Sequence, residues 1–581
     1  MNNTSKKLNG SEILIQCLIE QGVDTIFGYP GGAILNIYDK LYDHKEIKHI
    51  LTAHEQGASH AADGYARSTG KVGVCFATSG PGSTNLTTGV ATAYMDSSPV
   101  VFITCNVNSD LIGRDSFQEV DITGVTLPIT KCSYIVSNVK NLADTVREAF
   151  AIAKSGRPGP VLIDIQKNAT ADECEYYPVT PEEYFSSTDN RIARLKKSHH
   201  PSVSYPDIDL AAIDELAELI DKSEKPLLIC GGGVVRAKAS QEFRTLASRI
   251  DSPVAITVMG GGAFPGGNSL KTGMIGMHGS QASNMACDAC DLLIAVGCRF
   301  SDRVTLNPAG FAKNAKIVHI DIDPSEIDKN VKTDLHIIGD AKKILNLLLA
   351  KLKRDKKNDL WKDYVFSFKR ETEYDDRLDE TLTPKEILSS AAEILPQDTI
   401  VTTDVGQHQM WAIQHFKFDY PGQLITSGGF GTMGFGLGAA IGAQVGNPEK
   451  TVLHVTGDGS FRMNCNELCT EEYYKLPIIT LIFNNQTLGM VRQWQHLIYK
   501  ERYSQTTLDR GPDFSKLAEA YGVNGRKVTN VETLRKVLKE AVEARKNGDL
   551  TGWVIDCQID IDEMVRPMVG GNSFISEFML Y

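Results

Sequence analysis

Short apolar runs alternate with amphipathic segments along the whole 581-residue chain. The runs at 72–77, 99–104, 292–296 and 478–483 are each long enough for a buried strand, and each is followed by turn residues and a helix-like segment. Strands that alternate with helices predict parallel sheets with helices on both faces. We therefore predict an α/β protein built from doubly wound parallel sheets.

Two polar segments divide this pattern into three domains. One is rich in Pro, Ser and basic residues, and the other is strongly charged, as expected for linkers. The predicted order is a first domain at 1–175, a linker at 176–207, a second domain at 208–350, a linker at 351–382, a third domain at 383–560 and a C-terminal tail at 561–581. The first and third domains share an order of strands and helices but show no clear sequence repeat.

Composition narrows the class of protein. The formal net charge of −12 argues against a nucleic-acid-binding surface, and no apolar run approaches the ~18 residues that a membrane span needs. The first seven residues lack the apolar core of a secretory signal. The 12 cysteines lie mostly in apolar stretches, and the pair Cys287 and Cys290 has no second Cys/His pair at metal-site spacing. We expect buried thiols and a cytoplasmic protein without nucleic-acid or membrane partners.

Two polar turns follow neighbouring predicted strands in the third domain. Gly457-Asp458-Gly459-Ser460 follows the run at 452–455, and Asn484-Asn485-Gln486-Thr487 follows the run at 478–483, with a predicted helix at 466–474 between them. Because parallel strands end at one edge of a sheet, Asp458 and Asn485 should project toward one point. Oxygen ligands suit Mg²⁺, and glycines let a diphosphate approach the backbone. Simple turns would give either motif alone, but their separation matches one β-α-β crossover.

The first domain offers a carboxylate in a similar position. Glu55, in His54-Glu55-Gln56-Gly57-Ala58, ends the strand predicted at 47–52 and precedes a helix of small residues. Burial there would raise its pKa and make it a proton donor, although a solvated or capping glutamate is the plainer alternative. The second domain has glycine-rich turns at 231–233, 260–262 and 273–279, and a strand that ends in Asp321 and Asp323. These features predict a nucleotide-binding domain.

The spacing of GDG and NN resembles the cofactor motif of enzymes that depend on thiamine diphosphate (ThDP). The whole chain resembles the catalytic large subunit of acetohydroxyacid synthase (acetolactate synthase) in its anabolic, FAD-containing form. The matching stretches are FGYPGGA at 27–33, HEQGA at 54–58, TSGPGSTN at 78–85, SFQE at 116–119, GMHG at 276–279, RFSDRVT at 299–305, GQHQMWA at 406–412, GTMGFG at 431–436 and GMVRQWQ at 489–495.

The resemblance implies a role for each matching residue. Glu55 would protonate the aminopyrimidine, with Gln118, Lys167, Arg303 and Trp494 as the other catalytic residues; Arg303 and Trp494 would select the second 2-oxo acid. Gly32, Ala33 and Phe117 would contact substrate. Mg²⁺ would be held by Asp458, Asn485 and the Thr487 carbonyl. ThDP would contact Pro81, Asn85, Gly406, Gln407, His408, Gly431, Met433, Gly457, Asp458, Gly459, Ser460, Asn485, Gly489 and Met490. FAD would contact Arg157, Gly231, Gly232, Gly233, Thr257, Met277, His278, Gly297, Arg299, Arg303, Asp321 and Asp340.

The implied reaction removes CO₂ from pyruvate and joins the remaining two-carbon unit to a second 2-oxo acid, in the biosynthesis of branched-chain amino acids. Pyruvate would give 2-acetolactate, and 2-oxobutanoate would give 2-aceto-2-hydroxybutanoate. The main alternative is an oxidoreductase of the pyruvate oxidase type, which shares ThDP and FAD. The resemblance also implies a homodimer or tetramer with the active site between chains, and a small regulatory subunit.

The chain departs from the family pattern at several positions. Ser301 stands where many members have Asp, and Lys167 lies in Gln-Lys-Asn rather than Pro-Lys-Asp. Gly438 stands where Pro is common, Gly113-Arg-Asp replaces a more usual Gly-Thr-Asp, and the sequence after Pro567 is unusual. Whether the tail covers the active site therefore stays open.

Overall fold

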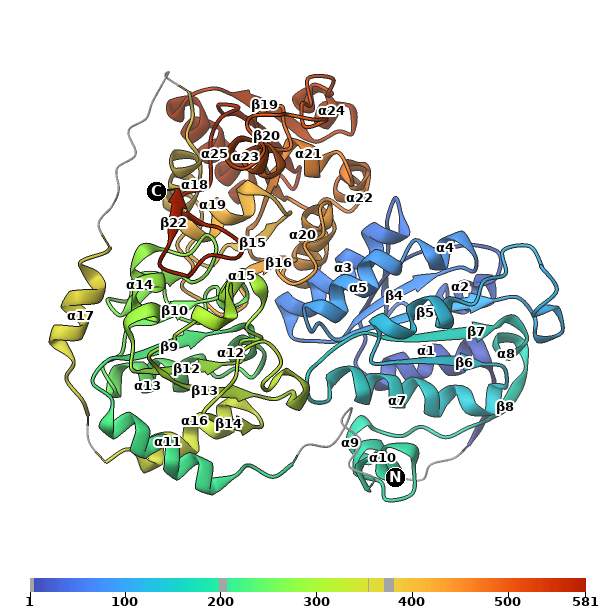
Figure 1. Cartoon of the computed structure of the whole chain (residues 1–581). Helices are drawn as coiled ribbons and strands as arrows, with labels where there is room; N and C mark the ends of the chain where they lie inside the picture. Colours follow the sequence, from blue (N-terminus) through green and yellow to red (C-terminus); the bar gives the residue numbers. More distant parts are fainter. Residues whose placement is uncertain (1–4, 198–205, 354, 370–380, 581) are drawn as a thin grey trace.

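The computed structural model describes residues 5–197, 206–353, 355–369 and 381–580. These residues form three six-stranded sheets in which all neighbouring strands are parallel, with helices packed on the sheet faces (Figure 1). The predicted fold of three doubly wound α/β domains is therefore confirmed.

The first sheet has the strand order β3-β2-β4-β5-β7-β6. Its strands are β2 (Thr25–Tyr29), β3 (Lys48–Leu51), β4 (Gly73–Ala77), β5 (Val100–Asn106), β6 (Cys132–Val136) and β7 (Val161–Gln166). Its helices are α1 (Gly10–Glu20), α2 (Leu35–Leu41), α3 (Glu55–Thr69), α4 (Pro81–Thr84), α5 (Thr87–Met95), α6 (Ile122–Thr126), α7 (Leu142–Lys154) and α8 (Lys167–Ala171). The central strands are buried on both faces, which explains their continuous apolar runs. An antiparallel pair, β1 (Lys6–Asn9) and β8 (Glu173–Tyr176), joins the two ends of this domain.

The third sheet, β16-β15-β17-β18-β20-β19, repeats the plan of the first: numbered within each domain, both orders are 2-1-3-4-6-5. Its strands are β15 (Ile400–Thr403), β16 (Leu424–Thr426), β17 (Val452–Gly457), β18 (Ile479–Asn484), β19 (Asn524–Val528) and β20 (Trp553–Gln558). Its helices are α18 (Pro384–Ile394), α19 (Gln407–His415), α20 (Phe435–Gly446), α21 (Asp458–Phe461), α22 (Leu468–Tyr473), α23 (Gly489–Leu497), α24 (Phe514–Ala520) and α25 (Val531–Lys546). The helix expected at 466–474 begins instead as a 3₁₀ turn at Cys465–Glu467.

The second sheet, β11-β10-β9-β12-β13-β14, has a different order, 3-2-1-4-5-6 when numbered within the domain. Its strands are β9 (Pro226–Cys230), β10 (Val254–Ile256), β11 (Lys271–Met274), β12 (Leu292–Val296), β13 (Lys316–Asp321) and β14 (Leu335–Ile338). Its helices are α11 (Leu210–Lys222), α12 (Gly232–Arg236), α13 (Ser240–Arg249), α14 (Gln281–Ala289), α15 (Asp302–Thr305) and α16 (Ala341–Lys351). This order is that of dinucleotide-binding folds, in which the ligand crosses the point between β9 and β12 where the strand order reverses.

The connecting segments also carry secondary structure. Helices α9 (Pro181–Ser186) and α10 (Arg191–Lys197) lie between the first two domains, and α17 (Asp359–Phe366) follows the second. Trp361 of α17 donates its indole N–H to the Pro226 carbonyl at 2.9 Å, so this helix packs on the second domain. In the tail, β21 (Met568–Val569) pairs with β22 (Phe578–Leu580), and the Val569 N–H donates to the Met277 carbonyl at 2.8 Å. The tail therefore contacts the second domain through β21, whereas Glu563, Val565 and Arg566 bond side chains of the third domain.

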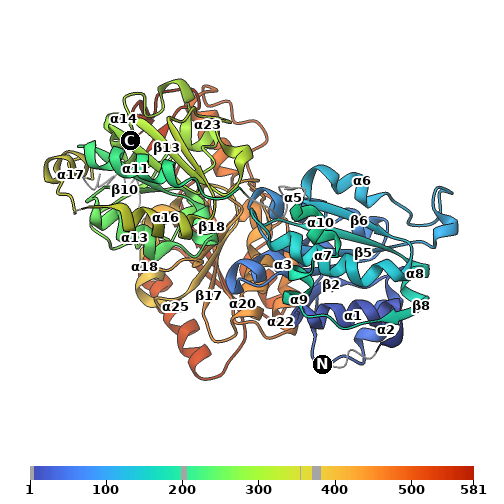
Figure 2. The ribbon, with the colours of Figure 1, turned by 90° about the horizontal axis from the view of Figure 1, so that it is seen from below.

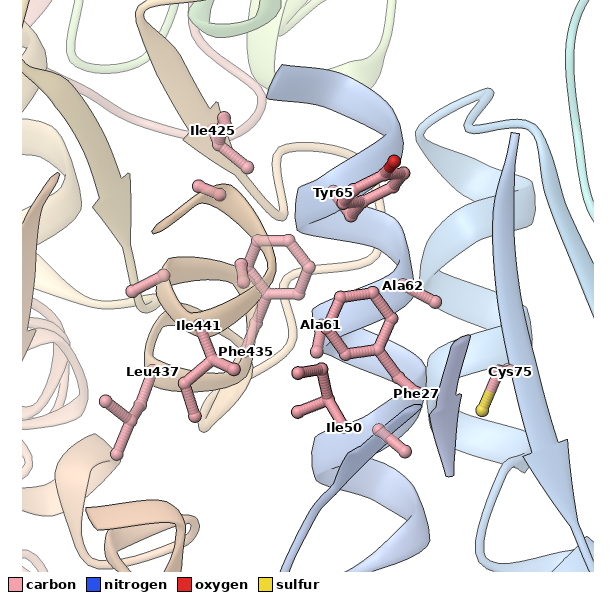
Figure 3. Close-up of a cluster of buried hydrophobic side chains, with 14 of the residues drawn as sticks. Phe27, Ile50, Ala61, Ala62, Tyr65, Cys75, Ile425, Phe435, Leu437 and Ile441 are labelled. Atoms are coloured by element: carbon pink, nitrogen blue, oxygen red, sulfur yellow. The ribbon is translucent and has the colours of Figure 1, made fainter. Parts of the chain in front are cut away.

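Helices α3 and α20 hold the first domain against the third (Figure 2). A Cβ atom added to Gly64 would lie 2.2 Å from the Ala439 carbonyl oxygen, and one added to Gly442 would lie 1.9 Å from the Ala61 oxygen. The two helices therefore touch backbone to backbone, which side chains at these positions would prevent. Figure 3 shows Tyr65 of α3 beside Phe435 of α20 in the buried apolar cluster that both domains share.

Among the described residues, no helix combines the length and apolar character needed to cross a membrane.

The contact between α3 and α20 predicts that one methyl group added at Gly442 lowers the stability of the protein. Gly442→Ala would force the helices apart, because its Cβ meets the Ala61 carbonyl oxygen of the facing backbone. We expect the free energy of unfolding, measured by guanidinium denaturation, to fall by about 1–3 kcal/mol. Gly446→Ala is the matched control, because its Cβ meets side-chain atoms of Thr69 and Tyr65, which can move. Equal denaturation midpoints for the two variants would contradict this account.

Candidate active site

Glu55 begins helix α3 directly after strand β3, at the carboxyl edge of the first sheet. Its side chain is 9% exposed, and its Oε2 atom accepts a hydrogen bond from the Asn85 amide at 2.9 Å. Its Oε1 atom lies against Gly82, where an added Cβ would stand 3.2 Å away. The carboxylate is therefore fixed from both sides, and Gly82 leaves the space that it occupies.

The loops beside Glu55 carry further candidates. A Cβ on Gly31 would lie 2.5 Å from Thr78 Cγ2, so the loop with Gly32 and Ala33 packs against the loop with Pro81 and Asn85. A Cβ on Gly80 would lie 2.8 Å from Gln118 Cβ, and Gln118 itself has a left-handed φ of 61°.

Phe117, next to Gln118, is 88% exposed. Lys167 begins α8 after strand β7, and its neighbour Gln166 accepts a hydrogen bond from the Ser109 hydroxyl at 2.6 Å. This bond ties the 109–119 loop to the Lys167 segment. The first-domain candidates other than Arg157 therefore share one edge, because the loops that carry them follow strands β2, β3, β4, β5 and β7, whereas Arg157 precedes β7.

Asp458 follows strand β17 and begins helix α21. Its side chain is 1% exposed, and its Oδ2 atom has no hydrogen-bond partner among the described residues. Burial raises the pKa of Asp458 to about 7. A buried carboxylate oxygen without a partner is costly unless a cation compensates it, which is what a metal ligand requires.

Asn485 follows the neighbouring strand β18, as predicted from the sequence. Its amide faces Gln407 Oε1 at 3.4 Å, and its Oδ1 accepts the Thr487 N–H at 3.3 Å. Gly489 packs closely against Gln407, because an added Cβ would stand 2.0 Å from Gln407 Oε1. Asp458 and Asn485 thus follow adjacent strands of one sheet, at the same edge.

His408 lies between two of the predicted glycines. Cβ atoms on Gly406 and Gly457 would each approach its ring to 2.8 Å. Burial lowers the pKa of His408 to about 4, so the ring is neutral at pH 7, and its Nε2 has no partner among the described residues. The GDGS turn also reaches the glycine-rich loop, because Ser460 Oγ accepts the Gly434 N–H at 3.1 Å.

The turns after β9 and β12 meet backbone to backbone in the second domain. A Cβ on Gly231 would lie 2.0 Å from the Gly297 carbonyl oxygen, and one on Gly233 would lie 2.5 Å from Gly297 Cα. Gly297 has a φ of 58°, a left-handed conformation that suits glycine. These glycines build the reversal point of the sheet, where a dinucleotide can approach the backbone.

A cavity of about 820 Å³ opens at this reversal point and extends to the third domain. Most of the predicted FAD residues line it, namely Arg157, Gly232, Gly233, Thr257, Met277, His278, Gly297, Arg299, Arg303, Asp321 and Asp340. Gly406, Gly431, Met490 and Trp494 line it from the third domain. Gly231 does not line it and instead supports Gly297. Asp340 also caps helix α16 by accepting the Lys343 N–H at 3.0 Å.

Charged residues that were not among the predicted site residues also line the cavity, and Arg67, Asp96 and Arg236 are three of them. Arg236 lies three residues after the Gly231–233 turn, and this position in the sequence could have identified it as a candidate binding residue. It donates to the Asp96 main-chain oxygen at 3.1 Å, and no carboxylate of the described residues lies within 4 Å of its guanidinium. Arg157 adds a second cation, paired with Asp323 and Glu326 at 3.2 and 3.0 Å.

The cavity gathers only some of the predicted site residues. Of the predicted first-domain residues, Arg157 lines the cavity and Glu55 does not. The end of α3 that carries Glu55 instead contacts Glu467, whose Oε1 accepts the His54 N–H at 3.0 Å. Asp458 and Asn485 do not line the cavity either, so the cavity gathers the FAD candidates and neither of these two edges.

The residues present fit the predicted cofactors. No cluster of three or more His, Cys, Asp or Glu residues in the described chain could hold a metal ion. A single carboxylate, an amide oxygen and a main-chain carbonyl instead suit Mg²⁺ that also binds phosphate oxygens. In the second domain, the close glycine turns and the arginines at the cavity wall suit a dinucleotide diphosphate, and the cavity volume lies in the range of ligand pockets.

Comparison with known families agrees with this architecture. Residues 8–125 match the N-terminal TPP-binding domain of thiamine pyrophosphate enzymes, residues 213–348 match their central domain, and residues 404–549 match their C-terminal TPP-binding domain. The chain therefore belongs to the thiamine pyrophosphate enzymes.

Whole-chain comparison narrows the family. The probable acetolactate synthase large subunit of Methanocaldococcus jannaschii is 45% identical over 97% of this chain and 93% of that protein. The acetolactate synthase large subunit of Parasynechococcus marenigrum is 45% identical over 98% of this chain and 90% of that protein. The Haemophilus influenzae protein of that name is 41% identical over 99% and 98%. Within the thiamine pyrophosphate enzymes, the chain belongs to the acetolactate synthase large-subunit family.

The unpaired Oδ2 atom of Asp458 predicts that this side chain lowers the stability of the cofactor-free protein and supports cofactor binding. At pH 8 the ionised, buried group destabilises the cofactor-free protein, so Asp458→Asn should raise its free energy of unfolding by roughly 1–3 kcal/mol. This gain should shrink as the pH falls from about 7 toward 4, because the folded wild-type protein then takes up a proton at Asp458. Calorimetric titration with ThDP and Mg²⁺ should show that the variant no longer binds the cofactor.

Asp404→Asn is the control for this prediction. Asp404 is equally buried, but Thr456 and the Gly436 N–H donate to it and its pKa is lowered to about 2. Its replacement should lower the free energy of unfolding at pH 8. If Asp458→Asn destabilised the protein as Asp404→Asn does, the assignment of an uncompensated carboxylate would be wrong.

Proposed function

We propose that this chain catalyses the synthesis of acetohydroxy acids from 2-oxo acids. Two pyruvate anions and one proton give 2-acetolactate and CO₂, and 2-oxobutanoate as the second substrate gives 2-aceto-2-hydroxybutanoate. The observation that carries the proposal is the orphaned Asp458 carboxylate at one edge with Asn485, in a chain of this family. A product of this kind belongs to the biosynthesis of branched-chain amino acids.

The third domain would hold the diphosphate end of the cofactor. Asp458, Asn485 and the Thr487 carbonyl would bind Mg²⁺, and the neutral His408 ring would face the phosphate oxygens through its unpaired Nε2. Gly431 and Met433 would support the aminopyrimidine and bend the cofactor. When bound, ThDP supplies a carbon nucleophile and an electron sink for the loss of CO₂.

The first domain would control protons at the other end of the cofactor. Glu55 is held by Asn85 at a buried edge, where its carboxyl group can exchange a proton with the aminopyrimidine. As the family resemblance implies, we propose that the first domain of one protomer meets the third domain of its partner, which would bring the Glu55 and Asp458 edges together. Gly32, Ala33, Phe117, Gln118 and Lys167 would then line the path of the substrate.

The second substrate would be selected at the cavity mouth. Arg303 is 68% exposed and pairs only loosely with its neighbour Asp302, at 3.3 Å, so its guanidinium is available for a carboxylate. Trp494 packs against the apolar cluster of the second domain and presents an indole to an alkyl group. One methylene in such a pocket changes binding by about 1–3 kcal/mol.

FAD would occupy the cavity of the second domain. Arg157, Arg236 and Arg299 would neutralise its diphosphate, and the Gly231–233 turn would let it approach the backbone. The overall reaction neither oxidises nor reduces its substrates, so we propose that FAD stabilises the architecture. The relatives are named large subunits, and we propose a small regulatory subunit as a partner, in the cytoplasm.

Product analysis tests the proposed function directly. Purified protein would be incubated with pyruvate, ThDP and Mg²⁺, with and without FAD and 2-oxobutanoate, and the products identified by NMR. We expect acetolactate that requires FAD and gives way to acetohydroxybutyrate when 2-oxobutanoate is present. Acetate or acetyl phosphate together with reduced flavin would contradict the proposal and indicate an oxidase.

A further inference from the structure

Helix α5 of the first domain reaches the glycine-rich loop of the third domain through two side chains one turn apart. The Thr92 hydroxyl lies 2.7 Å from the Thr432 hydroxyl, and Asp96 Oδ1 accepts the Gly429 N–H at 2.7 Å. Thr92 also donates to the Thr88 carbonyl at 2.8 Å, so its only proton is used and Thr432 must donate to it. The Thr92–Thr432 bond is buried and the Asp96–Gly429 bond is partly buried, with Thr92 0% and Asp96 4% exposed.

Asp96 is itself held from two other directions. Arg67 of α3 donates to Asp96 Oδ2 at 3.2 Å, is paired with Asp63 at 2.7 Å, and donates to the Thr426 carbonyl at 2.7 Å. Arg236 of the second domain donates to the main-chain oxygen of Asp96 at 3.1 Å. All three domains therefore meet at this one residue.

The contact between Asp96 and Gly429 also reaches the wall of the cavity. Arg299 donates to the Met95 carbonyl at 2.6 Å, and a Cβ on Gly429 would lie 2.7 Å from Arg299 Nη2 and 2.8 Å from Asp96 Oδ1. Gly429 is therefore the point where the loop, the carboxylate and a cavity-wall arginine come together. A side chain at this position would break all three contacts.

We infer that Thr92 and Asp96 are positioning residues that set the loop at 427–434 against the cofactor edge. The loop has a second anchor at its far end, where Gly434 donates to Ser460 of the GDGS turn. Helix α5 holds the first half of the loop, and the GDGS turn holds the second half. Gly431 and Met433 therefore have one defined position. This inference rests on the proposed function for the roles of Gly431 and Met433.

The contact also connects the two cofactor regions. Arg299 contacts both Met95 and Gly429. A ligand that binds Arg299 in the cavity would therefore influence the position of the loop. This provides a physical reason for a redox-neutral enzyme to depend on an occupied flavin cavity.

The first test needs no activity. Amide hydrogen exchange of the peptide spanning 427–434, followed by mass spectrometry, would compare wild type with Thr92→Val and Asp96→Asn. Thr92→Val keeps the shape and removes one hydroxyl, and Asp96→Asn keeps an oxygen for Gly429 but loses the charge that faces Arg67. We expect exchange to be about fivefold faster in each variant, the size of effect expected for one lost hydrogen bond.

Thr399→Val is the matched control. Thr399 is fully buried in the third domain, but its hydroxyl donates to the Pro396 carbonyl ahead of β15, away from the carboxyl edge. Exchange in the 427–434 peptide should be unchanged in this variant. Unchanged exchange in both Thr92→Val and Asp96→Asn, or equal acceleration in Thr399→Val, would overturn the inference.

The second test separates positioning from simple stability. For Thr92→Val we expect kcat to fall about fivefold with KM for pyruvate within twofold, and deuterium exchange at C2 of bound ThDP to slow by the same factor. A variant that only lowers the melting temperature and leaves C2 exchange unchanged would contradict a positioning role. Wild-type protein that makes no acetohydroxy acid would count against the proposed function, whereas the peptide exchange decides the positioning of the loop in either case.

Discussion

The arrangement of the domains depends on the contact between helices α3 and α20. Glycines on both helices let the backbones touch, with Gly64 against Ala439 and Gly442 against Ala61. No larger residue fits at these points, so the distance between the first and third domains is fixed by main-chain atoms. Arg67 on α3 then reaches the Thr426 carbonyl, and α5 behind it reaches the glycine-rich loop. The relative positions of the first and third domains follow from this one approach of two helices.

The parallel sheets explain why the candidate functional residues lie at one edge of each sheet. Each strand delivers its last residues to one edge, so Asp458 and Asn485 follow β17 and β18 at the same edge, and Glu55 after β3 bonds Asn85, which comes after β4. The second sheet has the dinucleotide-binding order and forms its cavity at the reversal point. Neither Glu55 nor Asp458 lines that cavity, and the proposed sharing of a site between two protomers would bring these two edges together.

The fold and the local motifs could be predicted from the sequence for the same physical reason. Buried parallel strands read as apolar runs, and the turns that follow them carry the glycines and acids, so Glu55, Asp458 and Asn485 were visible without a structure. The Arg67, Asp96 and Gly429 contact could not be predicted, because it joins residues far apart in the chain that have no local pattern. Helices α9 and α10 were also hidden, since polar composition dominates the segment that contains them.

The most direct test of the account is complementation between two inactive variants. Glu55→Gln lacks the proton-carrying edge, and Asp458→Asn lacks the metal-binding edge, so neither protein should be active alone. When the two are unfolded together and refolded, mixed dimers would contain one site with both wild-type residues, and we expect about one quarter of wild-type activity. No activity in the mixture, with dimers formed and wild type recovering normally, would contradict a site shared between chains.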